Sequence, residues 1–213
     1  SLYAGAGLRM ARFANAFDGR VGRVVLCIRG LESYWSSVLA YSVARGHRVP
    51  ARQDVAALAS GARQWRDVIT DLACAVPGAH IIVLTHEQSA GGMSDRVAAM
   101  TGRPKAALPR ADADDWLNRA PLLGGLRRTV AERGGDPRGL GDGADDARWM
   151  PFTPAQGAAL REAYADDLLW LRAGADGLAT LIEETGPAKA GTHPPDGQTT
   201  RGHRNGTEER RLA

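Results

Sequence analysis

Arg29 and the hydroxyl side chains that follow it could act together on an anion. Arg29 comes directly after a short apolar run, residues 24–28, and the next two helical turns carry Ser33, Ser36 and Ser37. A guanidinium group binds phosphate through parallel N–H donors, and the N-terminus of a helix adds free backbone N–H groups. The spacing therefore predicts an anion site, most naturally for a phosphate. The alternatives are a solvated arginine at a strand end, and serines that cap or pack the helix.

Two strand-to-helix units must position this site. Residues 24–28 are apolar and rich in β-branched side chains, which indicates a buried parallel strand, and the three- and four-residue apolar spacing over 31–44 indicates a helix. Arg29 then lies at the carboxyl edge of a sheet, where open α/β folds bind their ligands. Further along the chain the pattern predicts helices over 54–60 and 62–75, a strand over 80–84 and a helix over 95–100. The fold class expected is α/β, a parallel sheet flanked by helices.

The remaining segments are predominantly helical in pattern. Helices are expected over 2–17, within 112–133 and, after the N-cap pair Thr153–Pro154, through residue 171, with a long loop over 134–146. Asp166 and Asp167 on the last helix point in different directions because they are adjacent. We expect them to be solvated or paired with Arg161 and Arg172.

Composition places the chain among ordinary globular proteins. Its 213 residues are 44% hydrophobic and 24% charged with a net charge of +3, which fits one domain, expected over 1–184, and a disordered basic tail over 185–213. Apolar runs are too short for a membrane span, and no signal peptide is expected. Cys27 and Cys74 are interpreted as buried, reduced thiols of a cytoplasmic protein. Neither the cysteines nor the single, scattered histidines have metal-ligand spacing, so no metal is expected.

The first unit resembles the segment of the sulfotransferase family that binds the 3′-phosphate of the donor 3′-phosphoadenosine-5′-phosphosulfate. In that family an Arg ends a strand and a Ser stands eight positions later on the next helix, as Arg29 and Ser37 do here. The resemblance implies a P-loop-NTPase-like sulfotransferase fold with a helical C-terminal part. It also implies transfer of a sulfonate group from this nucleotide donor to a hydroxyl or amine of a small-molecule or glycan acceptor.

The second unit, residues 81–88 with Gly102 after the following helix, also resembles that family. His86 stands where the family has a Tyr near the adenine, so it would line the base pocket, or it is a plain polar residue at a strand end. Glu87 is expected to accept backbone N–H groups rather than to act as a catalyst. Arg201 and Arg204 resemble a basic segment that folds over a phosphate. His47 would extend the anion site or, alternatively, is a solvated loop histidine.

Some parts of the family pattern have no counterpart in this sequence. Gly30–Leu31 replaces the usual Asn-Pro, and no Gly-x-x-x-x-Gly-Lys-Ser/Thr phosphate loop is present. No His precedes Arg29, so no catalytic base is assigned, and the lysines, Lys105 and Lys189, follow no strand. The chain therefore resembles a piece of a longer protein that lacks its phosphate loop, and we expect it to be inactive in transfer by itself. The alternative function is a non-catalytic nucleotide- or nucleic-acid-binding α/β module, with nucleic acid the less favoured ligand. No oligomeric state is predicted.

Overall fold

The computed structural model describes residues 1–89, 93–104 and 120–183, and within them three parallel strands form one sheet. The strands are β1 (Arg23–Ile28), β2 (His80–Thr85) and β3 (Thr180–Ile182), in the order β1-β2-β3. The register pairs Arg23 with His80 and Ile28 with Thr85, so the carboxyl ends of β1 and β2 lie side by side. These parallel strands with intervening helices confirm the predicted α/β fold class.

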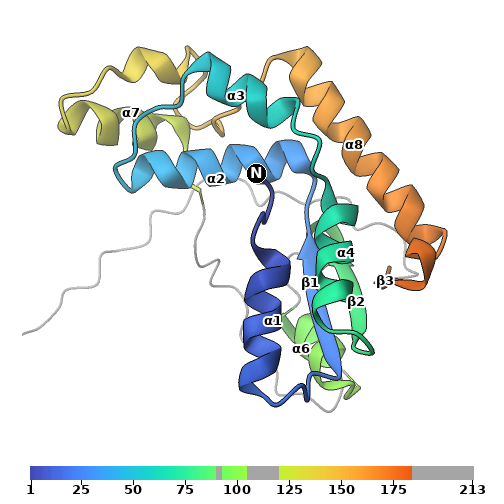
Figure 1. The fold of residues 1–213 in the computed structure, drawn as a ribbon. Coiled ribbons are helices and arrows are strands. Elements are labelled where there is room, and N and C mark those ends of the chain that lie inside the picture. The colour runs from blue at the N-terminus through green and yellow to red at the C-terminus, as the bar shows by residue number, and fades with distance from the viewer. Residues whose placement is uncertain (90–92, 105–119, 184–213) are drawn as a thin grey trace, which may run out of the picture.

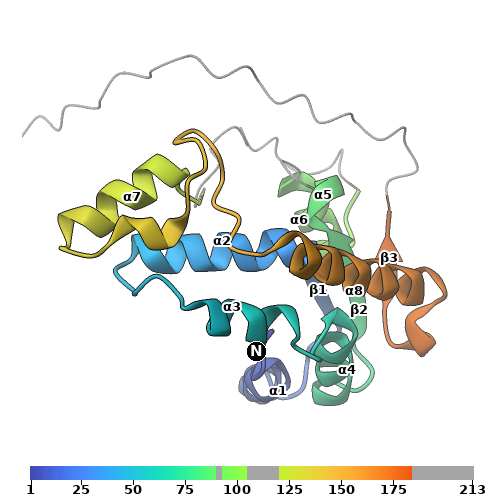
Figure 2. The same cartoon turned by 90° about the horizontal axis from the view of Figure 1, so that it is seen from above.

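Helices surround this sheet on both faces (Figures 1 and 2). Their bounds are α1 (Ala6–Ala16), α2 (Leu31–Ala44), α3 (Arg52–Ala59), α4 (Trp65–Ala75), α5 (His86–Ser89), α6 (Met93–Thr101), α7 (Leu123–Glu132) and α8 (Pro154–Arg172), with 3₁₀ turns η2 (Pro137–Leu140) and η3 (Ala175–Gly177). Helices α1 and α4 pack against each other on one face, and α5 and α6 lie on the other side of the sheet (Figure 2). Within the described ranges every helix is too short or too polar to form a transmembrane span.

The alternation of side chains along the strands explains why both faces are covered. Val24 and Ile28 of β1, with Ile81 and Val83 of β2, pack in the core that α1, α4 and α8 complete. The intervening side chains point to the opposite face, because successive residues of a strand alternate. There Ile82 and Leu84 pack against Ala99 of α6. The continuous apolar runs in both strands are therefore explained by burial on two faces.

Helix α2 leaves the sheet at the carboxyl end of β1 (Figure 1). Its far end packs in a second hydrophobic core. Ala40 and Val43 in its last turns pack against Leu126 and Val130 of α7 and against Trp149. The loop predicted over 134–146 contains the short turn η2. The first part of the helix predicted over 112–133 and the predicted tail lie outside the described residues.

Several element predictions differ from the structure, among them the bounds of α3 and α6, each of which begins two residues earlier than predicted. The first helix begins at Ala6 rather than at residue 2, because Tyr3 has a φ of 42° and forms a turn ahead of it. Helix α4 begins at Trp65 rather than at residue 62. The C-terminal part is not entirely helical, since β3 follows η3 and pairs with β2.

The expectation of two buried thiols is also wrong. Cys27 on β1 is half-buried and Cys74 is exposed. Cys74 falls off the buried stripe of α4, which consists of Trp65, Val68, Ile69 and Leu72. Its helical spacing from these residues directs it to solvent.

Candidate anion-binding site

Arg29 lies at the junction predicted from the sequence, between the last residue of β1 and the first turn of α2. Its Nε donates a hydrogen bond of 3.0 Å to Oγ of Ser33, and that hydroxyl donates to the carbonyl oxygen of Gly30 over 2.9 Å. These bonds hold the half-buried guanidinium against the start of the helix. Because Nε is engaged within the protein, a phosphate ligand would be bound through the two terminal nitrogens of the fork.

The three serines in the first half of α2 have different surroundings. Ser36 is buried and donates to the carbonyl oxygen of Glu32 over 2.8 Å, so it is a packing residue, one of the alternatives considered for it. Ser33 contacts Arg29 directly, whereas Ser37 is half-buried and lies one turn further on the same helix face. The hydroxyl groups of Ser33 and Ser37 therefore lie one turn apart on the same face of α2.

His86 follows β2 directly and lies within the electrostatic range of Arg29. Its pKa is lowered from the ordinary value, first by burial and then by the positive charge of Arg29. Glu87 partly opposes this shift, while Arg96 on α6 and Arg148 add to it. The lowered pKa favours the neutral imidazole. The structure thus brings His86 and Arg29, both predicted site residues, to the same edge of the sheet.

Arg148 was not singled out in the sequence, yet it belongs to this cluster. It lies between η2 and α8, where its backbone forms an antiparallel bridge with Leu122. The pKa of Arg29 is lowered by burial and next by the charge of Arg148, against the opposing charge of Glu87. Because both arginines stay charged near neutral pH, the repulsion between Arg29 and Arg148 persists until an anion offsets it.

Glu87 is the carboxylate within this group, and both of its oxygens have a partner. Oε1 accepts the backbone N–H of Gly30 over 2.9 Å, and Oε2 accepts the hydroxyl of Tyr164 over 3.0 Å. The pKa of Tyr164 is raised, mainly by burial and next by the negative charge of Glu87. The predicted role of Glu87 as an acceptor of backbone N–H groups is confirmed.

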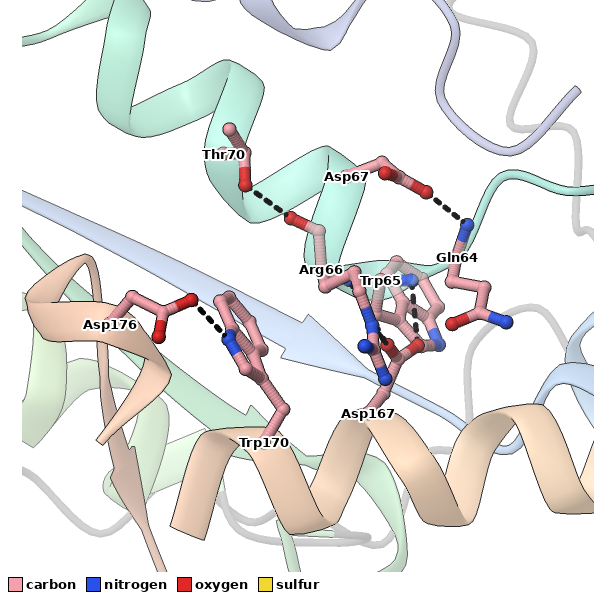
Figure 3. A network of polar contacts seen from close by, with 8 residues as sticks. All are labelled: Gln64, Trp65, Arg66, Asp67, Thr70, Asp167, Trp170 and Asp176. Carbon is pink, nitrogen blue, oxygen red and sulfur yellow. Dashed lines mark hydrogen bonds and ion pairs between the residues drawn. The ribbon is translucent and has the colours of Figure 1, made fainter. Parts of the chain in front are cut away.

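A second polar network joins α8 to α4 behind the site (Figure 3). The side chain of Asp167 is completely buried and accepts the backbone N–H of Trp65 and Nε of Arg66, each over 2.8 Å. A carboxylate at this position caps the N-terminus of α4. The indole Nε1 of Trp65 in turn donates to the carbonyl oxygen of Arg29 over 2.9 Å. The network therefore extends to the backbone of the predicted anion-binding residue.

The expected surroundings of Asp167 were wrong. Asp166 is exposed, but Asp167 is neither solvated nor paired with Arg161 or Arg172. Those two arginines form ion pairs with Glu32 and Glu183 instead. Burial raises the pKa of Asp167, and its hydrogen bond with Arg66 opposes this shift.

No family model, no curated protein and no solved structure matches this chain.

The other predicted residues contribute less to the site. His47 is exposed and follows the C-terminal end of α2, about 20 Å along the helix from Arg29, so it does not extend the site. Arg201 and Arg204 lie outside the described residues. In the part of the chain that the structure describes, no three His, Cys, Asp or Glu side chains are grouped to hold a metal ion.

Proposed function

We propose that this protein binds a phosphorylated nucleotide at the carboxyl edge of β1 and β2, with Arg29 on a phosphate group. The observation that carries the proposal is that Arg29 and His86 directly follow neighbouring strand ends at the start of α2, where the charge of Arg29 acts on His86 and that of Arg148 acts on both. Their mutual repulsion is relieved when a phosphate dianion binds among them. The hydroxyl of Ser37 and the N-terminus of α2 add neutral donors.

The specific ligand we propose is 3′-phosphoadenosine-5′-phosphosulfate, or its product adenosine 3′,5′-bisphosphate. The proposed family context is a sulfotransferase-like domain of the P-loop-NTPase-like fold. In it Arg29 and Ser37 hold the 3′-phosphate and His86 lines the adenine pocket. Support comes from the order strand, Arg29, helix, and from the serine eight residues later. In the transfer step of such a domain an acceptor hydroxyl or amine attacks the sulfur, the bond between the sulfur and the 5′-phosphate oxygen breaks, and adenosine 3′,5′-bisphosphate leaves. The acceptor's proton goes to a base that is not assigned in this chain, which we expect to be inactive in transfer by itself. Arg29 anchors the donor during this step and takes no proton.

Calorimetry with adenosine 3′,5′-bisphosphate tests the proposal. Arg29→Ala removes a charged hydrogen bond, and we expect a loss of about 2 kcal/mol, roughly thirtyfold in affinity. Arg20→Ala is the matched control, because Arg20 is exposed, pairs with Asp18 and lies near the opposite end of β1. Equal affinities for the wild type and Arg29→Ala would overturn the proposal.

A second titration identifies which phosphate Arg29 contacts. Adenosine 5′-monophosphate lacks the 3′-phosphate, so the wild type should bind it more weakly than the bisphosphate. Arg29→Ala should bind both nucleotides with nearly equal affinity, because the interaction that distinguishes them is gone. If Arg29→Ala weakened both nucleotides by the same factor, Arg29 would not be the 3′-phosphate ligand.

A further inference from the structure

The peptide unit between Arg29 and Gly30 is held from two sides. Its carbonyl oxygen accepts the indole N–H of Trp65, and its N–H donates to Oε1 of Glu87, each over 2.9 Å. Both groups belong to one planar unit. Two hydrogen bonds to opposite ends of this plane therefore fix its orientation, and with it the direction in which the Arg29 side chain leaves the backbone.

The two side chains that hold this peptide are themselves held by α8. Trp65 is only 1% exposed, and its backbone N–H is bonded to Asp167 (Figure 3). Glu87 is bonded through its other oxygen to the hydroxyl of Tyr164. Tyr164 and Asp167 are three residues apart and therefore lie on the same face of α8. One helix face thus supports both contacts to the Arg29–Gly30 peptide.

Gly30 explains why this junction needs such support. Its φ of −48° and ψ of 126° are accessible to any residue, so no left-handed conformation requires a glycine here. A glycine backbone samples more conformations than other residues, and Gly30 has no side chain that could cap α2. Without outside contacts the peptide before it could rotate and take the guanidinium with it.

We propose that Trp65 and Glu87 are positioning residues for Arg29, holding the Arg29–Gly30 peptide so that the guanidinium faces the bound phosphate. The proposal rests on the proposed nucleotide-binding function. Neither side chain needs to touch the ligand. Their effect is preorganisation: the orientation of Arg29 is fixed before binding, so less conformational freedom is lost when the phosphate arrives.

Trp65→Phe tests the contact to the carbonyl group, because it removes the indole N–H. Trp170→Phe is the matched control, since its indole N–H donates to Asp176 over 2.7 Å, away from Arg29. We expect Trp65→Phe to weaken binding of adenosine 3′,5′-bisphosphate about tenfold and Trp170→Phe to leave it unchanged. In the Arg29→Ala background, Trp65→Phe should have almost no effect on affinity, because it acts through Arg29. An equal loss in both backgrounds would overturn the positioning role of Trp65.

Glu87→Gln and Glu87→Ala test the contact to the N–H group. Both variants remove the negative charge of Glu87, which would repel a bound phosphate. The resulting gain in phosphate affinity is therefore the same in both and cancels when they are compared. Only Gln keeps an oxygen that can accept the N–H of Gly30. We expect Glu87→Gln to bind the bisphosphate more tightly than Glu87→Ala, and equal affinities would overturn the positioning role of Glu87. These variants also keep the test decisive if Trp65→Phe does not fold.

The outcomes separate this inference from the function on which it rests. A wild-type protein that does not bind the bisphosphate would overturn both. Normal wild-type binding, lost in Arg29→Ala but unchanged in Trp65→Phe and equal in the two Glu87 variants, would overturn the positioning role alone. Melting temperatures of all variants, measured without ligand, show whether each change in affinity accompanies unfolding.

Discussion

The positive charge of Arg29 acts on the neighbouring His86, and this coupling makes the proposed binding depend on pH. The pKa of His86 is lowered by burial and by the charge of Arg29. A bound phosphate dianion offsets that charge and favours the imidazolium form. We therefore expect the pKa of His86 to rise when the ligand binds. The affinity for adenosine 3′,5′-bisphosphate should then increase as the pH falls through the range in which His86 of the complex becomes protonated.

NMR titration of the imidazole C–H signals, with and without the bisphosphate, measures this shift. His86→Gln identifies the signal, and the exposed His47 provides an internal reference. An unchanged His86 titration in the presence of saturating bisphosphate would place the phosphate away from this side chain.

Asp167 makes the stability of the fold depend on pH, because its side chain is buried in the folded chain and solvated in the unfolded chain. Burial raises its pKa, so the folded chain binds this proton more tightly than the unfolded chain does. The contribution of Asp167 to the free energy of unfolding is therefore largest below its unfolded pKa and is lost as the pH rises through the raised folded value. Urea denaturation over a pH series should show the difference between wild type and Asp167→Asn falling with rising pH. Asp166→Asn, at the exposed neighbouring position, is the control and should lack this trend.

The site residues predicted from the sequence are those that local pattern can reveal. The position of Arg29 in the fold was predictable because a buried strand ends before it and a helix begins after it. The partner of Asp167 was predicted wrongly because Arg66 is 101 positions away along the chain, and no local spacing indicates that contact. The spacing of Tyr164 and Trp65 within their helices likewise gives no sign of their hydrogen bonds to Glu87 and to the carbonyl oxygen of Arg29. Their polar atoms have partners that only the packing of α8 and α4 on the sheet brings into reach.

At the scale of elements, α8 supports both the core and the site, and the sequence shows clearly where it begins. Thr153 and Gln156 form a reciprocal cap: the Thr153 hydroxyl accepts the N–H of Gln156, and the Gln156 side chain accepts the N–H of Thr153. We expect Thr153→Ala to lower the free energy of unfolding by about 1 kcal/mol. Thr70→Ala on α4 is the matched control, because its hydroxyl bonds a carbonyl within the helix and Ala has the higher helix propensity there. Urea denaturation of both variants checks this, and an equal effect would show that the cap contributes nothing.

An element can be predicted from the sequence only when it is long enough to show its own apolar period. The strand ending at Ile28 and the helix Leu31–Ala44 were predictable because each is long enough to show its own period. Strand β3 has three residues, Thr180–Ile182, which is too short for any alternation to stand out. It forms only because η3 turns the chain back after α8 and brings it beside β2. Pairing of this kind is decided by tertiary packing rather than by local propensity.

At the scale of the whole molecule, the distribution of positive charge bears on the size of the ligand that we propose. The net charge is only +3. Many arginines are matched by carboxylates in ion pairs among the described residues, at Arg20, Arg48, Arg63, Arg66, Arg127, Arg161 and Arg172. Around His86 the positive charges of Arg29, Arg96 and Arg148 oppose the negative charge of Glu87, which is already bonded to Gly30 and Tyr164. We expect such a local group of charges to bind one or two phosphate groups rather than a long polymer.

Salt dependence separates the two classes of ligand. Each phosphate contact on a nucleic acid adds about 0.9 to the slope of log affinity against log salt concentration. Between 50 and 200 mM salt, two contacts therefore predict about a tenfold loss of affinity and six contacts about a thousandfold loss. We expect the smaller loss for adenosine 3′,5′-bisphosphate. A single-stranded oligonucleotide should bind no more tightly than the bisphosphate at any of these salt concentrations. Arg29→Ala should reduce both the affinity and the salt slope for the bisphosphate, because it removes one contacting charge, whereas Arg20→Ala should change neither. Tight oligonucleotide binding with a steep salt slope would instead favour the nucleic-acid-binding alternative. If that slope persisted in Arg29→Ala, the phosphate contacts would be made by other arginines.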